Sequence, residues 1–145
     1  MAAVESEIAK HAGHSVTLIG SSLGGYYATY LAERHNVRAV LINPAVFPHL
    51  GLRAYLGVQR NLHTHRQYEL TERHLRQWEQ LYLPSVHPER YLLLVETGDE
   101  VLDYREAVQK YAGARQVVIE GGDHALHSFP EQIPLILEFA RITPH

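Results

Sequence analysis

The sequence predicts an α/β fold with a mostly parallel sheet of about four strands, flanking helices and an inserted helical cap. Short β-branched and aliphatic runs alternate with helical patterns along the chain, an order typical of parallel strands joined by crossover helices. The chain has 145 residues, of which 46% are apolar, so it can bury a core of its own. We therefore expect residues 1–145 to form one domain.

Each expected element has its own signal in the sequence. A repeat of Val4, Ile8 and Ala12 predicts an opening helix that Gly13 ends. Four apolar runs predict strands at residues 16–19, 38–42, 91–96 and 117–119. Asn43 stops the second of these strands, together with the proline that follows it. Helical spacing predicts helices at residues 24–34, 104–111 and 131–141.

The segment between the second and third strands, residues 49–89, is too long for a simple crossover. It is rich in histidine, tyrosine and arginine, and we expect it to form the inserted cap. A helical stripe within it packs onto the domain rather than forming a cofactor site; its members are Leu70, Leu75, Trp78, Leu81 and Tyr82. By analogy at the level of the fold, four cap residues are expected to shape specificity: Tyr55, His63, His65 and Tyr68.

Residues 20–24, Gly-Ser-Ser-Leu-Gly, lie between the first expected strand and the next helix. They match the Gly-x-Ser-x-Gly nucleophile elbow, in which a serine occupies a strained turn between a strand and a helix. Glycines two positions to either side let the strand and the helix approach closely. Ser22, rather than Ser21, is therefore the candidate nucleophile. The alternative is a glycine-rich turn in which a serine caps the helix.

Two later loops supply candidate partners for this serine. Asp99 follows the third strand, and His124 follows the fourth in the stretch Gly-Gly-Asp-His. The carboxyl ends of parallel strands meet at one edge of a sheet, so Ser22, Asp99 and His124 are expected to lie together. Their order, serine then acid then histidine, is the order found in α/β-hydrolases. His124 would accept the serine proton and return it to the leaving group, while Asp99 would orient the imidazole.

Asp99 has three rivals for the role of the acid. Asp123 is next to the histidine in sequence and would tend to point away from it. Asp103 stands where the next helix should begin, as an N-cap. Asp99 is favoured over Glu100 and Asp103 because the turn directly after a strand positions a side chain most rigidly.

Composition excludes several other classes of function. The net charge of -3, with both signs mixed along the chain, argues against a nucleic-acid partner. The absence of cysteine excludes disulfides, thiolate zinc sites and cysteine nucleophiles. No run approaches the roughly 18 apolar residues of a membrane span, and the start of the chain carries glutamates, so we expect a cytoplasmic location and no membrane partner. His63, His65 and His74 lack the carboxylate or cysteine pattern that would complete a metal site, so no metal is expected.

Five stretches of this sequence closely resemble the small YqiA-type bacterial esterases of the α/β-hydrolase superfamily. They are GSSLGGYYATYL (20–31), NPAV (43–46), QYELTERH (67–74), TGDEVLDYREAV (97–108) and VIEGGDHA (118–125). The resemblance implies Ser22 as nucleophile, Asp99 as acid and His124 as base. It also implies hydrolysis of small-molecule carboxylic esters with short or simple acyl chains, thioesters included, without a metal or organic cofactor. Around this triad, the residues expected to serve the oxyanion or the substrate are Leu23, Ser21, Tyr26 and His127.

The chain departs from that family at its start. About fifteen residues precede the first expected strand and have a helical pattern, so the opening strands and the His-Gly loop that supplies one oxyanion-hole amide are missing, and the fold is expected to be a truncated α/β-hydrolase. The Leu23 amide remains as one donor, and losing the other costs on the order of 10² to 10³ in rate. The strand at Val16 to Ile19 would have one unpaired edge, which predicts a homo-oligomer formed there. A catalytically weak or inactive binding or assembly module is the alternative function.

Overall fold

The computed structural model describes residues 1–11, 15–51, 57–60 and 67–140. The chain divides into two compact units, one made of Met1–Val46 with Pro84–His145 and the other of Phe47–Leu83. The second unit overlaps most of the expected cap, residues 49–89, whereas residues 84–89 belong to the first unit.

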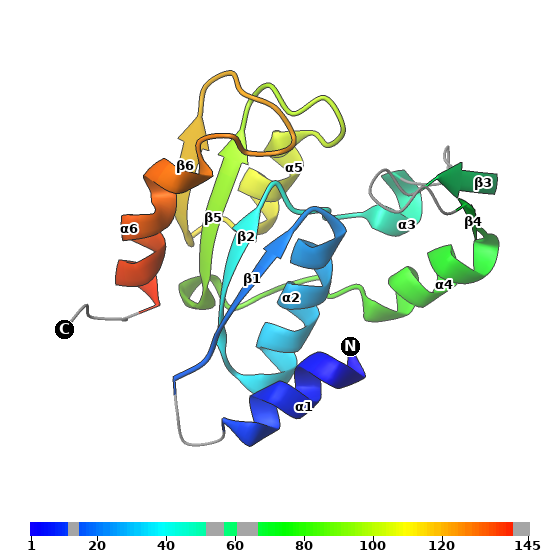
Figure 1. Ribbon diagram of the computed structural model, residues 1–145, viewed down its shortest axis with the longest axis horizontal. Coiled ribbons are helices and arrows are strands. Elements are labelled where there is room, and N and C mark those ends of the chain that lie inside the picture. The colour runs from blue at the N-terminus through cyan, green and yellow to red at the C-terminus, as the bar shows by residue number, and fades with distance from the viewer. Residues whose placement is uncertain (12–14, 52–56, 61–66, 141–145) are drawn as a thin grey trace. The chain divides into compact units, whose positions relative to one another are not determined.

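The first unit is built on a four-stranded parallel sheet with the strand order β1-β2-β5-β6 (Figure 1). Its strands are β1 (Thr17–Ser21), β2 (Arg38–Ile42), β5 (Tyr91–Glu96) and β6 (Arg115–Ile119). The predicted fold class is thereby confirmed. β2 and β5 have the predicted bounds, whereas β1 extends two residues further, because Ser21 still pairs with Ile42. β6 begins two residues earlier than predicted, at Arg115, which pairs with Leu92.

Helices cover both faces of this sheet. The helices of this unit are α1 (Ala2–Lys10), α2 (Leu23–His35), α5 (Tyr104–Lys110) and α6 (Phe129–Phe139), with a short 3-10 turn η2 (Pro88–Arg90) before β5. Of these, α1 contributes no buried residue. On one face, alternate residues of the two middle strands form a core cluster with α6; its buried members are Val40, Ile42, Leu92, Leu94, Leu126 and Ile136. On the opposite face, Tyr91 packs on Tyr111, whose hydroxyl is 2.6 Å from Thr29 of α2. Both middle strands are buried on both faces, in keeping with their largely apolar sequences.

β1 is an edge strand of this sheet. In the described part of the chain, β1 pairs with β2 alone. Its Ile19 side chain is 56% exposed. The predicted unpaired edge is therefore present among the described residues.

A partly buried carboxylate, that of Glu33, connects α2 to the chain before β5. Glu33 accepts hydrogen bonds from His87 and from the Tyr91 hydroxyl, and it pairs with Arg90 at 3.1 Å. Burial alone would raise the pKa of Glu33, but these hydrogen bonds, with the charge of Arg90, hold it below its ordinary value.

We expect Glu33 to make the free energy of unfolding depend on pH in the acidic range. Because its folded pKa is lowered, its contribution is fully present above the ordinary pKa of about 4.5 and is lost as pH falls through the lower folded value. Urea unfolding between pH 3 and 6 should therefore show a steeper loss of stability for wild type than for Glu33→Gln. Parallel curves for the two proteins would contradict this expectation.

The second unit contains α3 (Pro48–Gly51), β3 (Gly57–Arg60), β4 (Gln67–Leu70) and α4 (Glu72–Leu81). The expected all-helical cap is wrong on one point, because β3 and β4 pair as a two-stranded antiparallel sheet. Leu70 consequently belongs to β4 rather than to the helical stripe. Leu75 and Trp78 of α4 are buried, as the stripe predicts.

Four predicted specificity residues belong to this second unit. Tyr55, His63 and His65 lie outside the described residues. Tyr68 pairs with Gln59 in the backbone ladder of the two-stranded sheet. Their expected roles stay predictions.

No helix in the described ranges combines the length and the apolarity needed to cross a membrane.

Candidate functional site

Ser22 sits in a strained turn between the end of β1 and the start of α2. Its φ of 56° and ψ of -122° lie where non-glycine residues are seldom found. The backbone is fixed on both sides, since the Ser22 N–H donates to the Ile42 carbonyl at 3.0 Å and the Ser22 carbonyl accepts from Ala45 N at 2.9 Å. This is the geometry of a nucleophile elbow, with the serine held on the turn.

Glycines make the turn sterically feasible. The motif predicts close approaches at Gly20 and Gly24, and the structure has one of them at Gly25 instead of Gly24. A Cβ on Gly20 would lie 2.3 Å from the Gly24 carbonyl oxygen, so Gly20 is required. A Cβ on Gly24 would meet nothing within 4 Å. The close approach on the helix side occurs instead at Gly25, whose added Cβ would lie 2.7 Å from the Pro44 Cβ. The expectation that Gly24 is needed for close packing is therefore wrong.

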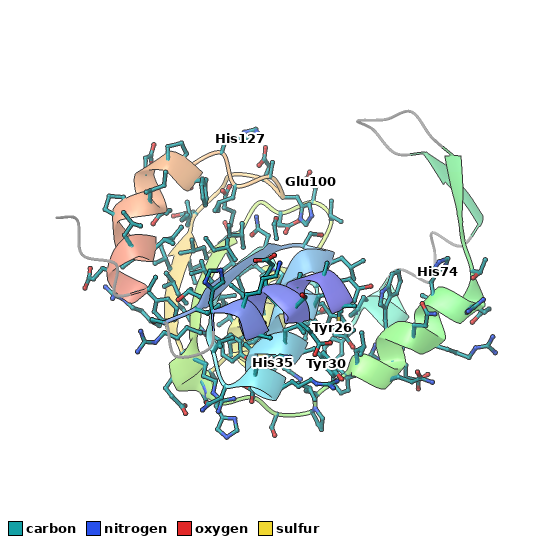
Figure 2. All side chains as sticks on the ribbon, turned by 60° about the horizontal axis from the view of Figure 1, so that its bottom comes forward. Tyr26, Tyr30, His35, His74, Glu100 and His127 are labelled. Carbon is teal, nitrogen blue, oxygen red and sulfur yellow. The ribbon has the colours of Figure 1, made fainter. Side chains whose placement is uncertain are left out.

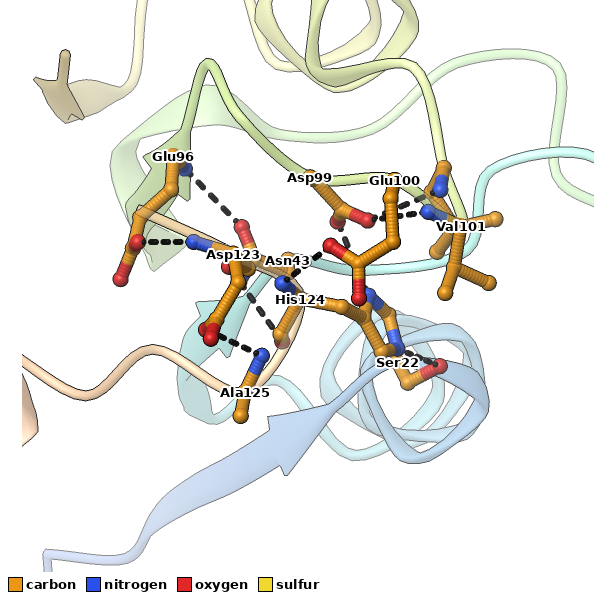
Figure 3. Close-up of polar contacts among 10 residues, drawn as sticks. Ser22, Asn43, Glu96, Asp99, Glu100, Val101, Asp123, His124 and Ala125 are labelled. Carbon is orange, nitrogen blue, oxygen red and sulfur yellow. Dashed lines mark hydrogen bonds and ion pairs between the residues drawn. The ribbon is translucent and has the colours of Figure 1, made fainter. Parts of the chain in front are cut away.

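The structure brings Ser22, Asp99 and His124 together at the carboxyl edge of the sheet (Figure 3). His124 Nε2 is 2.9 Å from Ser22 Oγ, and His124 Nδ1 is 2.9 Å from Asp99 Oδ2. A carboxylate only accepts hydrogen bonds, so Nδ1 donates to Asp99 and Nε2 is left to accept from the serine hydroxyl. The histidine is thus in the tautomer that a general base requires.

Asp99 is held in place by its own loop. Its Oδ1 accepts from the backbone N–H groups of Val101 and Leu102, both at 2.9 Å, which leaves Oδ2 for His124. The Asp99 side chain is only 2% exposed, while the His124 side chain is 22% exposed. The acid is therefore shielded from solvent, whereas the histidine is accessible to a substrate.

The three rival acids contact other groups. Asp103 accepts from Arg105 N at 3.0 Å as the N-cap of α5, as predicted. Glu100 accepts from the backbone N–H of His124 at 3.2 Å, not from its ring. Asp123 accepts from Ala125 N at 3.0 Å. In the described part of the chain, Asp99 alone of these carboxylates is hydrogen-bonded to the imidazole.

The other predicted site residues differ in their exposure and in their contacts. Leu23 is the first residue of α2, so its N–H lacks an intrahelical acceptor and stands beside Ser22. Ser21 is exposed at the end of β1. Tyr26 is 6% exposed on α2, where it belongs to the core (Figure 2). His127 is 82% exposed and pairs with Asp123 at 3.3 Å, projecting outward in Figure 2.

The sequence did not predict a role in the site for Asn43, which contacts the backbone of the loop that carries His124. Asn43 is 2% exposed and has a φ of 42°. Its Nδ2 donates to the carbonyl oxygens of Asp123 and His124 at 3.2 and 2.9 Å (Figure 3). The Asn-Pro pair predicted only the end of a strand.

His74, the described member of the three cap histidines, has a structural partner. Its Nδ1 accepts from Thr71 N at 3.0 Å, which completes a capping box at the start of α4. Across the residues that the structure describes, no group of three or more His, Asp or Glu side chains is placed to hold a metal ion.

Comparison with known proteins gives a family and a fold. A family model described as "Uncharacterised protein family (UPF0227)" matches residues 1–141. The structure resembles the esterase domain of a Rhodothermus marinus protein, at 19% identity and a TM-score of 0.56, over 86% of this chain and 59% of that one. It resembles mouse alpha/beta hydrolase domain-containing protein 10, at 17% identity and a TM-score of 0.59, over 86% of this chain and 62% of that one. It also resembles the Paleococcus ferrophilus monoacylglycerol lipase, at 16% identity and a TM-score of 0.61, over 94% of this chain and 72% of that one.

This chain spans 59% and 62% of the first two of those structures. At these identities the likeness shows the fold, which is that of the α/β-hydrolases. The family match covers almost the whole length and includes the stretches that resemble YqiA-type proteins. The chain therefore belongs to the uncharacterised protein family UPF0227, the family of the YqiA-type proteins.

Proposed function

We propose that this protein is a serine hydrolase that cleaves carboxylic esters through an acyl-enzyme on Ser22. The observation that carries the proposal is the imidazole of His124, which lies 2.9 Å from both Ser22 Oγ and Asp99 Oδ2. The strained elbow supports it, because backbone strain of this kind clusters at active sites. Esterases and a lipase among the similar structures support the same class.

The proposed reaction has two halves. Ser22 Oγ attacks the acyl carbon while its proton passes to His124 Nε2, and the Leu23 N–H faces the developing oxyanion. His124 then gives that proton to the leaving alkoxide as the C–O bond breaks. In the second half, His124 takes a proton from water and the hydroxide attacks the acyl carbon. The bond from the acyl carbon to Ser22 Oγ then breaks, the acid leaves, and His124 returns the proton to Ser22 Oγ. Asp99 stabilises the imidazolium in both halves.

We propose short or simple acyl chains as substrates, thioesters included, as the resemblance to YqiA-type esterases implies. None of the steps above draws on a metal or an organic cofactor.

A fluorophosphonate probe tests the proposal directly. Wild type should form a covalent adduct that peptide mass spectrometry places on Ser22, and it should hydrolyse p-nitrophenyl acetate and butyrate. Ser22→Ala should lose both signals, because the nucleophile is gone. Ser85→Ala is the matched control, since Ser85 is exposed outside the site, and it should behave as wild type. The proposed hydrolase activity would be refuted if wild type formed no adduct and had no more activity than Ser22→Ala.

The alternative is a catalytically weak or inactive binding or assembly module, and the free edge of β1 favours it. We propose that a second copy of the chain binds this edge, because exposed strand edges pair with other strands and each copy offers the same one. The exposed Ile19 side chain would lie in that contact.

Sedimentation at micromolar concentration tests this self-association. Ile19→Lys should shift the protein to monomer, because lysine on an edge strand opposes pairing. Val118→Lys makes the same change on the opposite edge strand, where Val118 is 46% exposed, and should leave the assembly intact. A wild-type protein that sediments as a monomer would rule the proposal out.

A further inference from the structure

The loop that carries His124 has no regular secondary structure, yet its backbone is bound at successive residues. It leaves β6 through Gly121 and Gly122, whose φ values are 81° and 71°. A glycine pair gives a loop conformational freedom that a catalytic histidine cannot tolerate without restraint. Gly121 N donates to Thr97 Oγ1 at 2.7 Å, and Asp123 N donates to Glu96 Oε2 at 2.6 Å.

The side chain of Asn43 forms hydrogen bonds with this loop and with β5, and these bonds use both of its N–H groups and its oxygen. Both Nδ2 protons go to the loop, to the carbonyls of Asp123 and His124. Its Oδ1 accepts from Glu96 N at 3.0 Å in β5. Its own N–H donates to the Leu94 carbonyl at 2.9 Å. A buried amide bonded in this way is fixed in one orientation.

The residues next to Asn43 hold the nucleophile. The Ile42 carbonyl accepts from Ser22 N, and Ala45 N donates to the Ser22 carbonyl. Residues 42–45 are therefore bonded on one side to the backbone of Ser22 and on the other to the backbone of His124. We call this short segment, residues 42–45, the strut. It connects Ser22 and His124 through hydrogen bonds to their backbones, in addition to the contact between their side chains.

Glu96 provides a second attachment for the same loop. Its side chain is buried, and Oε2 holds the N–H of Asp123 while Asn43 holds the carbonyl of Asp123. A Cβ on Gly122 would overlap the Glu96 carboxylate, so the loop passes directly over this side chain. Glu96 Oε1 has no hydrogen-bond partner among the described residues. An unpaired buried oxygen costs stability, so Glu96 is better explained by its role at the loop than by the core.

We infer that Asn43, with Glu96, is a positioning residue that sets the distance between His124 and Ser22. This inference rests on the proposed function of the same site. The hydrogen bonds of their side chains go to backbone groups of the His124 loop and of β5, not to Ser22 Oγ or to the imidazole. Displacing a catalytic group by about 1 Å costs on the order of 10² in rate, and the strut is what prevents that displacement.

Removing the Asn43 side chain tests the inference. Asn43→Gly deletes all three side-chain hydrogen bonds without backbone strain, because glycine accepts the φ of 42°. Fluorophosphonate inactivation should show a rate constant kinact lowered about 10²-fold, with the inhibition constant KI changed less than about twofold. Asn36→Gly is the matched control, since Asn36 has a φ of 56° at the far end of α2, and it should leave both constants unchanged.

A pair of Glu96 variants decides the matter if Asn43→Gly does not fold. Glu96→Gln keeps an acceptor for Asp123 N and should label at close to the wild-type rate. Glu96→Leu removes the acceptor and places an apolar side chain in the same buried position, so the variant should fold. Its labelling by the fluorophosphonate should be slower than that of wild type. Equal kinact for these two variants, or an unchanged kinact in folded Asn43→Gly, would overturn the inference.

Amide hydrogen exchange separates this inference from the proposed function. Exchange at residues 120–128 should become at least about tenfold faster in Asn43→Gly, whether or not the protein is an enzyme. If wild type is not labelled at Ser22, the proposed function fails, and faster exchange still supports the restraint on the loop. Unchanged exchange in that case overturns the inference as well.

Discussion

Replacing Asp99 with asparagine should lower kcat for p-nitrophenyl esters by roughly 10⁴-fold with little change in KM. The size is that of the corresponding change in a serine protease triad. Asp99 Oδ2 accepts the proton on His124 Nδ1, which leaves Nε2 free to accept from Ser22. An asparagine amide offers hydrogens in the same place, so the imidazole would carry its proton on Nε2 and could no longer serve as the base. Steady-state kinetics with matched melting curves measures the effect.

The same substitution at Asp103 is the control. Asp103 accepts from Arg105 N as the N-cap of α5, and asparagine caps a helix about as well as aspartate. Asp103→Asn should therefore keep kcat within about twofold of wild type. If Asp103→Asn or Glu100→Gln lost as much activity as Asp99→Asn, Asp99 would not be the acid of the triad.

The sequence predicted the sheet best where strands are buried. β2 and β5 are continuous apolar runs closed by Asn43 and by Gly98, and both have their predicted bounds. The edge strands β1 and β6 are longer than predicted, because pairing with a neighbour extends the ladder into residues of low strand propensity. β3 and β4 were missed. Each has only four residues of mixed polarity, so nothing local distinguishes them from loop, and what makes them strands is their partner.

Within the site, sequence predicted the residues that carry a local motif. Ser22 has its elbow, and Asp99 and His124 each follow a strand with a glycine nearby, so the topology of a parallel sheet brings them together. Asn43 has no such signal. Its role depends on a positive φ and on a loop that lies 80 residues later in the chain. The burial of Tyr26 likewise has no local signal, because packing sets which face of α2 is covered.

A single methyl group at Gly20 should disable the elbow. The added Cβ of Gly20→Ala would lie 2.3 Å from the Gly24 carbonyl oxygen and 2.8 Å from Gly25 N, both of them backbone atoms that cannot rotate away. β1 and the start of α2 would have to separate. Overpacking of this kind costs about 3 kcal/mol or more, which is a large part of the stability of a small domain. We expect a melting temperature lowered by about 10 °C or a protein that does not fold.

Gly24→Ala makes the same chemical change four residues later and should have the opposite effect. Its Cβ would meet nothing within 4 Å, and Gly24 lies in α2, where alanine is favoured over glycine by up to about 1 kcal/mol. Melting temperatures and urea midpoints of both variants, measured beside wild type, test the pair. If Gly20→Ala were as stable as Gly24→Ala, the close approach of strand and helix would not be the reason for Gly20. Where Gly20→Ala does fold, Ser22 is displaced with the strand, so fluorophosphonate labelling should slow on the order of 10²-fold while Gly24→Ala labels at the wild-type rate.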